Sequence, residues 1–171
     1  FLTHNKKNKL DITILGAGSN TLIRDKGIKG VVIKLGSGFT DIRLLDNDIL
    51  EVGAAALDRK ISDFAKDKGI GNLEFLSCIP GSIGGAVIMN SGCYGNDISK
   101  ILVSIRVINT KNCTEKEIKS EEIEFFYRGS NLPEGTIITS VKVRGKKENP
   151  EVIEKTQKKL IEKKKLAQPS K

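Results

Sequence analysis

Short runs of apolar and β-branched residues alternate with turn residues over the first third of the chain. This alternation predicts β-strands over residues 11–15, 31–35, 42–45 and 48–52. Asp46 and Asn47 separate the last two runs, which is typical of a hairpin turn. Two later β-branched runs, 101–109 and 136–143, predict further strands. Short strands joined by tight turns favour an antiparallel or mixed sheet.

Three other segments follow helical rules. Residues 57–68 carry apolar residues at helical spacing and precede Gly69, which predicts an amphipathic helix; we assign it no role beyond packing. Residues 83–89 predict a short apolar helix with Ser82 as its N-cap. Asn149 and Pro150 are a typical helix start, so a third helix is expected from Pro150 to Leu166. Strands and helices together predict the α+β class.

The net charge of +8 is concentrated at one end of the chain. Residues 142–171 hold eleven Lys or Arg against four Glu, a net +7. A basic nucleic-acid-binding protein is therefore one alternative, but no Phe or Tyr lies among these lysines to stack on bases. The favoured interpretation is a solvated helix face, without nucleic acid as a partner.

The cysteine and histidine content argues against a metal site. Cys78, Cys93 and Cys113 are widely spaced, and His4 is the single histidine, so no metal ligand set is expected. An odd number of scattered cysteines fits a reduced, cytoplasmic compartment. No apolar run has membrane-spanning length, so no membrane partner is expected. The chain opens on FLTHNKKNKL without Met, and we expect it to be cut from a longer protein.

Residues 73–96 are rich in glycine and contain no Lys, Arg or His. The Pro80-Gly81-Ser82 corner leads into the short helix, whose free amide N–H groups could bind an anion beside Gly84 and Gly85. A tightly packed helix crossing would need the same small residues. The glycine content leaves both interpretations open.

A second glycine turn follows the first strand, in the run ILGAGSNTL at residues 14–22. It begins like the dinucleotide fingerprint G-x-G-x-x-G, but Thr21 stands at the third glycine and strand-like sequence follows. A Rossmann unit is therefore not predicted. Ser19 and Asn20 instead suit a polar turn whose amides point at one anion. Two uncharged turns could together hold a diphosphate.

Three segments carry a resemblance to a known family. They are LGAGSNTLIRD at 15–25, EFLSCIPGSIGGAVIMNSGCYG at 74–95 and FFYRGS at 125–130. The chain resembles the UDP-N-acetylenolpyruvoylglucosamine reductases, also called UDP-N-acetylmuramate dehydrogenases, over about residues 12–171. The resemblance implies an FAD-binding domain of the vanillyl-alcohol oxidase / p-cresol methylhydroxylase type. It would consist of part of a first FAD-binding subdomain (1–56), a second (57–148) and a helix (149–171) leading to a substrate-binding domain.

The family implies an FAD-dependent oxidoreductase of peptidoglycan synthesis. Such an enzyme would contribute to cell wall biogenesis, and through it to cell shape and cell division. NADPH would reduce FAD, which passes hydride to the enolpyruvyl group of a UDP-sugar. By resemblance, FAD would be bound by Gly16, Ala17, Gly18, Ser19, Asn20, Ile79, Pro80, Gly81, Ser82, Gly84, Gly85, Ala86, Asn90 and Gly92.

Arg128 matches the active-site arginine of the family. Its guanidinium would bind the substrate carboxylate and stabilise the charge that hydride addition builds there. Tyr127 would either shape this substrate pocket or belong to the core. The serine proton donor of the family and its glutamate partner are expected beyond Lys171, so we expect this chain alone to bind FAD weakly or not at all and to be inactive. A non-catalytic nucleotide-binding module is the remaining alternative.

Overall fold

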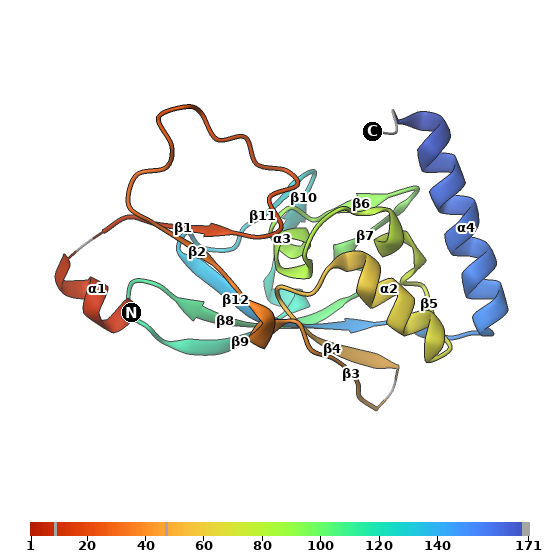
Figure 1. The fold of residues 1–171 in the computed structure, drawn as a ribbon. Helices are drawn as coiled ribbons and strands as arrows, with labels where there is room; N and C mark the ends of the chain where they lie inside the picture. Colours follow the sequence, from red (N-terminus) through yellow and green to blue (C-terminus); the bar gives the residue numbers. More distant parts are fainter. Residues whose placement is uncertain (9, 47, 169–171) are drawn as a thin grey trace.

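The computed structural model describes residues 1–8, 10–46 and 48–168 (Figure 1). Its centre is a five-stranded sheet in the order β3-β4-β12-β8-β9, in which all neighbours are antiparallel. The strands are β3 (Ile42–Leu44), β4 (Ile49–Gly53), β8 (Leu102–Asn109), β9 (Glu115–Lys119) and β12 (Thr136–Arg144). Together with the helices, this sheet confirms the predicted α+β class.

One face of the sheet forms the core. Val141 of β12 lies opposite Val52 of β4 on one side and opposite Ile105 of β8 on the other, and all three are buried. A short helix, α3 (Ile83–Ile88), packs against β4 and β12 and buries Ile83 and Val87. The period-two alternation of the strands therefore places their apolar side chains under α3.

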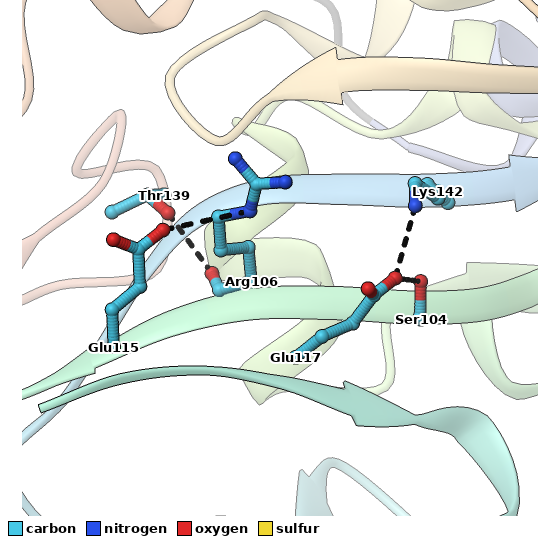
Figure 2. A network of polar contacts seen from close by, with 6 residues as sticks. All are labelled: Ser104, Arg106, Glu115, Glu117, Thr139 and Lys142. Carbon is cyan, nitrogen blue, oxygen red and sulfur yellow. Dashed lines mark hydrogen bonds and ion pairs between the residues drawn. The ribbon is translucent and has the colours of Figure 1, made fainter.

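The opposite side of the sheet carries a polar network (Figure 2). Ser104 Oγ donates to Glu117 Oε1 at 2.6 Å, and Lys142 Nζ lies 3.0 Å from the same oxygen. Two hydrogen bonds lower the pKa of Glu117: the one from Ser104 contributes most, and the one from Lys142 comes second. Arg106 Nε lies 3.5 Å from Glu115 Oε1 in the same network. An open groove of about 1210 Å³ runs along this face. Two of the residues that line the groove, Glu117 and Lys142, neutralise each other's charge.

Two longer helices lie outside the sheet. In Figure 1, α4 (Pro150–Ala167) runs along the edge of the molecule beyond α2 (Asp58–Asp67). It packs on α2 and on the 3-10 helix η2 (Glu74–Cys78), and Ile153 is its buried apolar anchor. Gln157 Nε2 donates to Ser62 O at 3.1 Å and to Ser62 Oγ at 2.7 Å. The helix therefore contacts other helices of its own chain.

The remaining elements are short and peripheral. β1 and β2 form a parallel pair, and the other three pairs are antiparallel. The bounds are α1 (Leu2–Asn8), β1 (Ile12–Leu15), β2 (Val31–Lys34), β5 (Ile70–Gly71), β6 (Gly92–Cys93), β7 (Asn96–Asp97), β10 (Phe125–Phe126), β11 (Gly129–Ser130) and β13 (Lys146–Lys147). Further 3-10 helices are η1 (Ser37–Phe39), η3 (Ile98–Lys100) and η4 (Ser120–Glu122).

The predicted ends of the helices are mostly confirmed. Gly69 follows α2 with φ +67°, and Asn149 Oδ1 accepts from Glu151 N at 2.9 Å to cap α4. Ser82 stands at the N-cap of α3, but its side chain does not cap the helix. β3 and β4 pair as the predicted hairpin, and the Asn47 part of its turn lies outside the described residues.

The sheet extends across the predicted division at residue 56. β3 and β4 precede that residue, whereas β12, which pairs with β4, follows it. The three-part division into FAD-binding subdomains and a connecting helix stays a prediction.

Candidate functional site

The turn that follows β1 presents its main chain to solvent. Residues 16–20 are exposed, and Gly18 has φ +83°, a conformation that suits glycine. Thr21 N donates to Gly18 O at 3.3 Å, which closes the turn. Within the described part of the chain, the amides of Ala17, Ser19 and Asn20 have no hydrogen-bond acceptor. These N–H groups could donate to an anion, and the predicted anion site at this turn stays a prediction.

The start of α3 offers fewer free amides than the sequence predicts. Ile83 N donates to Ala56 O at 3.0 Å, and Gly84 N donates to Ala54 O at 2.9 Å. These bonds hold α3 on the segment that follows β4. The expectation of a set of free amides at this helix start is therefore wrong for its first two residues, because the main chain of 54–56 accepts from them.

The two glycine segments meet face to face. A Cβ atom on Gly16 would lie 2.9 Å from Ser82 Oγ and 3.9 Å from Gly85 Cα. Gly81 faces the same turn, because its Cβ would lie 3.8 Å from Ser19 Oγ. The absence of side chains at these positions lets two segments 62 or more residues apart in sequence approach closely.

The glycines of residues 73–96 differ in what surrounds them, and the packing interpretation holds for two of them. Gly84 serves packing, since its Cβ would lie 3.0 Å from Ala54 Cβ and from Ala54 O. Gly92 also serves packing, since its Cβ would overlap the main chain of Asn96 across the β6–β7 pair. Gly85 has room for a Cβ, because the nearest atom to it would be Ser82 Oγ at 3.7 Å, an ordinary van der Waals distance. A ligand could therefore approach the helix at Gly85.

The other predicted binding residues differ in access. Pro80 is exposed and Ile79 is half-buried, whereas Ala86 is buried and cannot present its side chain to a ligand. The amide of Asn90 is occupied by the protein: Nδ2 donates to Phe126 O at 3.5 Å, and Oδ1 accepts from Ser99 N at 3.0 Å. Asn90 therefore ties the end of α3 to the β10–β11 hairpin.

Arg128 lies at the tip of the β10–β11 hairpin. It is exposed and has φ +61°, and its guanidinium carbon lies 5.6 Å from the centre of the Tyr127 ring. Ser130 Oγ donates to Ile88 O at 3.1 Å, so the hairpin is fixed to α3 at a second point. Tyr127 is 89% exposed, and the interpretation of it as a core residue is wrong. Its ring shares the hairpin tip with Arg128.

Sequence reasoning missed Asp58, the first residue of α2. Its side chain is fully buried, and within the described residues neither carboxyl oxygen has a hydrogen-bond partner. Burial raises the pKa of this carboxyl from 3.8 to about 8. Its main-chain N–H donates to Gly81 O at 3.0 Å, next to the facing turns. An acidic residue at a helix start is common, so the sequence alone does not single it out.

The described residues hold no group of three or more His, Cys, Asp or Glu side chains that could bind a metal. Cys78, Cys93 and Cys113 are free thiols. Burial raises the pKa of Cys93 to about 11, and the neighbouring Cys78 makes a smaller contribution in the same direction. Across the described ranges, no helix is both long and apolar enough to cross a membrane.

Two facing glycine turns without charged side chains, the first of which has three unpaired amides, suit the diphosphate of a dinucleotide. Residues 1–116 match the family model described as an FAD binding domain, and the chain belongs to this family. This membership confirms the predicted fold class and FAD as the cofactor.

Two similar proteins show which kind of FAD-binding protein this chain resembles. The chain is 48% identical to the UDP-N-acetylenolpyruvoylglucosamine reductase of Pelagibacter ubique (strain HTCC1062) over 163 residues, 95% of this chain and 54% of that protein. The crystal structure of UDP-N-acetylenolpyruvylglucosamine reductase from Thermus caldophilus aligns with a TM-score of 0.87 and 30% identity, covering 100% of this chain and 62% of that one. These matches confirm the resemblance predicted from the motifs.

Proteins other than these reductases have a similar fold. The structure of 6-hydroxy-D-nicotine oxidase from Arthrobacter nicotinovorans aligns with a TM-score of 0.59 and 13% identity, over 85% of this chain and 33% of that chain. This likeness concerns the fold alone. The chain spans about half the length of the curated relatives that it matches.

Proposed function

We propose that the chain is the FAD-binding part of a reductase that converts UDP-N-acetylglucosamine enolpyruvate to UDP-N-acetylmuramate in peptidoglycan synthesis, with NADPH as the reductant. The observation that carries the proposal is the contact between the Gly16–Asn20 turn and the start of α3, with the Arg128 hairpin fixed to the other end of α3. The relatives' names support the substrate and the reaction. The free cysteines support a cytoplasmic location.

The main chain of the first turn would bind the diphosphate of FAD. Ala17, Ser19 and Asn20 offer N–H groups, and the open side of Gly85 leaves room for the cofactor against α3. No cation is needed, because several amide dipoles aimed at one anion supply the positive potential. Ile79, Pro80, Gly81 and Ser82 would complete this wall of the site.

Arg128 would bind the carboxylate of the enolpyruvyl group. Bound FAD supplies the hydride-transfer chemistry between NADPH and the substrate double bond. Hydride addition β to a carboxylate builds negative charge on that group, and a fixed guanidinium stabilises this charge more in the transition state than in the ground state. Tyr127, at 89% exposure beside it, would contact the substrate rather than the core.

Gly85→Leu tests the cofactor site without disturbing the fold. A Cβ there meets no atom closer than Ser82 Oγ at 3.7 Å, and leucine raises helix propensity in α3 by about 1 kcal/mol relative to glycine. We expect the variant to unfold at the same or a higher temperature than the wild type and to lose FAD, as measured by the flavin absorption bands of the purified protein.

Gly38→Leu is the matched control, because nothing lies within 4 Å of a Cβ at Gly38 and this residue lies in η1, outside the two glycine segments. It should retain FAD. Both measurements use the longest form of the protein that its gene encodes. Retention of wild-type FAD affinity by a folded Gly85→Leu variant would contradict the proposed site.

A further inference from the structure

The β10–β11 hairpin, which carries Arg128, needs support from outside itself. Two residue pairs join its strands, Phe125 with Ser130 and Phe126 with Gly129. An isolated two-stranded hairpin is marginally stable at best in water. Arg128 in the turn has φ +61°, a left-handed conformation that is unfavourable for a residue with a long side chain. Such a backbone persists where the surrounding structure holds it.

The C-terminal end of α3, against which β11 packs, supplies part of that support (Figure 1). The last four carbonyl groups of a helix lack a partner within it. Three of those in α3 accept from main-chain amides that follow the helix: Gly85 O from Met89 N at 3.1 Å, Ala86 O from Ser91 N at 2.8 Å and Val87 O from Asn90 N at 3.1 Å. The fourth, Ile88 O, accepts from Ser130 Oγ at 3.1 Å. A hairpin side chain thus completes the end of the helix.

Asn90 stands where a helix most often has glycine. Its amide and that of Ser91 make the two bonds of a Schellman motif, and its φ is +41°. Glycine suits this position because it lacks a Cβ atom. The asparagine side chain makes two further bonds, from Nδ2 to Phe126 O at 3.5 Å and from Ser99 N to Oδ1 at 3.0 Å. The side chain of Asn90 therefore serves the hairpin and η3, and the helix end does not require it.

The two attachments lie on either side of the turn at residues 127–128. Phe126, whose carbonyl accepts from Asn90, directly precedes the turn, and Ser130 belongs to the strand that follows it. Gly129 has no room for a side chain, because its Cβ would overlap the ring of Phe126. The hairpin is therefore closed by the Phe126 ring and fixed to α3 through both of its strands.

We propose that Ser130 and Asn90 are positioning residues for Arg128, which hold its guanidinium where the substrate carboxylate binds. The inference rests on the proposed function. It assigns Asn90, which the resemblance places in the cofactor site, to the support of the active-site arginine. Stabilisation of charge in a transition state requires a donor that is already in place, so a hairpin that leaves α3 part of the time lowers kcat.

Ser130→Ala removes the donor to Ile88 O and leaves the main-chain bonds of α3 intact. A hydrogen bond of ordinary net strength favours the attached hairpin by about threefold to tenfold, so kcat for the enolpyruvyl substrate should fall by up to about tenfold. Ser130→Thr keeps the hydroxyl and should recover most of the wild-type kcat. Both variants should bind FAD as the wild type does, as measured by the flavin absorption bands, because Ser130 lies outside the two glycine segments.

Asn90→Gly keeps the left-handed helix end and removes both side-chain bonds. Because the bond to Phe126 O is longer than that of Ser130, kcat should fall by less, about threefold. Asn90→Asp retains an acceptor for Ser99 N and lacks the donor to Phe126 O, so kcat should fall at least as far as in Asn90→Gly.

The decisive comparison uses Arg128→Asn as a second background. If Ser130 acts through the guanidinium, Ser130→Ala should change kcat by less than about twofold once Arg128 is replaced. The matched control is Ser104→Ala, since Ser104 also donates one side-chain hydrogen bond, at 2.6 Å, but on the opposite side of the sheet. Its kcat should equal that of the wild type. All measurements use the longest form of the protein that its gene encodes, and thermal unfolding checks that each variant is folded.

The outcomes separate this inference from the proposed function. A wild type without reductase activity, or a wild-type kcat in Arg128→Asn, refutes both. In an active enzyme that needs Arg128, an unchanged kcat in Ser130→Ala refutes the role of Ser130, and so does an equal fall of kcat in both backgrounds. An unchanged kcat in Asn90→Gly, or loss of FAD from it, refutes the role of Asn90. If Ser130→Ala does not fold, the two Asn90 variants carry the same test in both backgrounds.

Discussion

Replacing Asp58 by asparagine should stabilise the apo protein, and the gain should grow as the pH rises. In the unfolded chain, this carboxyl ionises near its ordinary pKa of 3.8, whereas burial raises its pKa in the fold to about 8. Between these two values, folding must take up a proton. The wild type therefore keeps its full stability below about pH 4 and loses it progressively until about pH 8. Asparagine fills nearly the same space and has no proton to take up.

The size of the effect follows from the width of this pH window. Each pH unit inside the window costs the wild type about 1.4 kcal/mol. Between pH 5 and pH 7, the difference in unfolding free energy between Asp58→Asn and the wild type should therefore grow by about 3 kcal/mol. The lack of hydrogen-bond partners affects the buried amide and the buried acid alike, so it cancels to first order in this difference.

The assay is urea unfolding of both apo proteins at pH 5, 6 and 7, with Asp63→Asn as the control. Titration of every other group is common to wild type and variant, so it drops out of the comparison. A difference that is the same at all three pH values would show that the carboxyl is ionised in the fold. It would refute the assignment of Asp58 as a buried neutral acid.

Two further changes test other parts of the molecule. Arg128→Asn keeps a residue that tolerates the φ of +61° at the hairpin tip, so we expect FAD binding to be unchanged. On a form of the protein that turns over, steady-state kinetics should show kcat for the enolpyruvyl substrate lower by about 10² to 10³. A kcat close to that of the wild type would exclude the guanidinium from the reaction. Gln157→Leu removes the donor to Ser62 and should lower the unfolding free energy by about 2 kcal/mol in urea. Ser62→Ala in the same chain should recover part of that loss, and an equal loss with and without Ser62 would show that the two do not interact.

Local sequence rules found most of the fold. The caps at Gly69 and Asn149 and the β-branched runs of β4, β8 and β12 are features that neighbouring residues decide, and the structure follows them. β9 (Glu115–Lys119) escaped notice because its sequence EKEIK buries a single residue, Ile118, and carries charges at the sheet edge. The order of the strands was not predicted, because pairing between β4 and β12 depends on contacts that span 80 or more residues.

The candidate site also combines features that short stretches of sequence predict with features that depend on tertiary packing. Glycine content and the lack of cations are composition features of short segments, and they were enough to suggest that two uncharged turns could hold a diphosphate. The structure adds that the two turns face each other. The loss of the Ile83 and Gly84 amides to Ala56 and Ala54 could not be predicted, because it depends on how α3 docks. Burial of Asp58 is likewise a property of the packed molecule. Only the tertiary structure separates it from an ordinary acid at a helix start.

Two hydrogen bonds between the β10–β11 hairpin and the C-terminal end of α3 have a consequence for how the molecule can move. Ser130 and Asn90 attach the hairpin to one end of the helix whose other end touches the Gly16 turn. The Arg128 hairpin is thus bonded to the end of this six-residue helix, and the Gly16 turn lies against its start. A movement of α3 would carry the Arg128 hairpin with it, so the position of the guanidinium relative to this helix would be preserved.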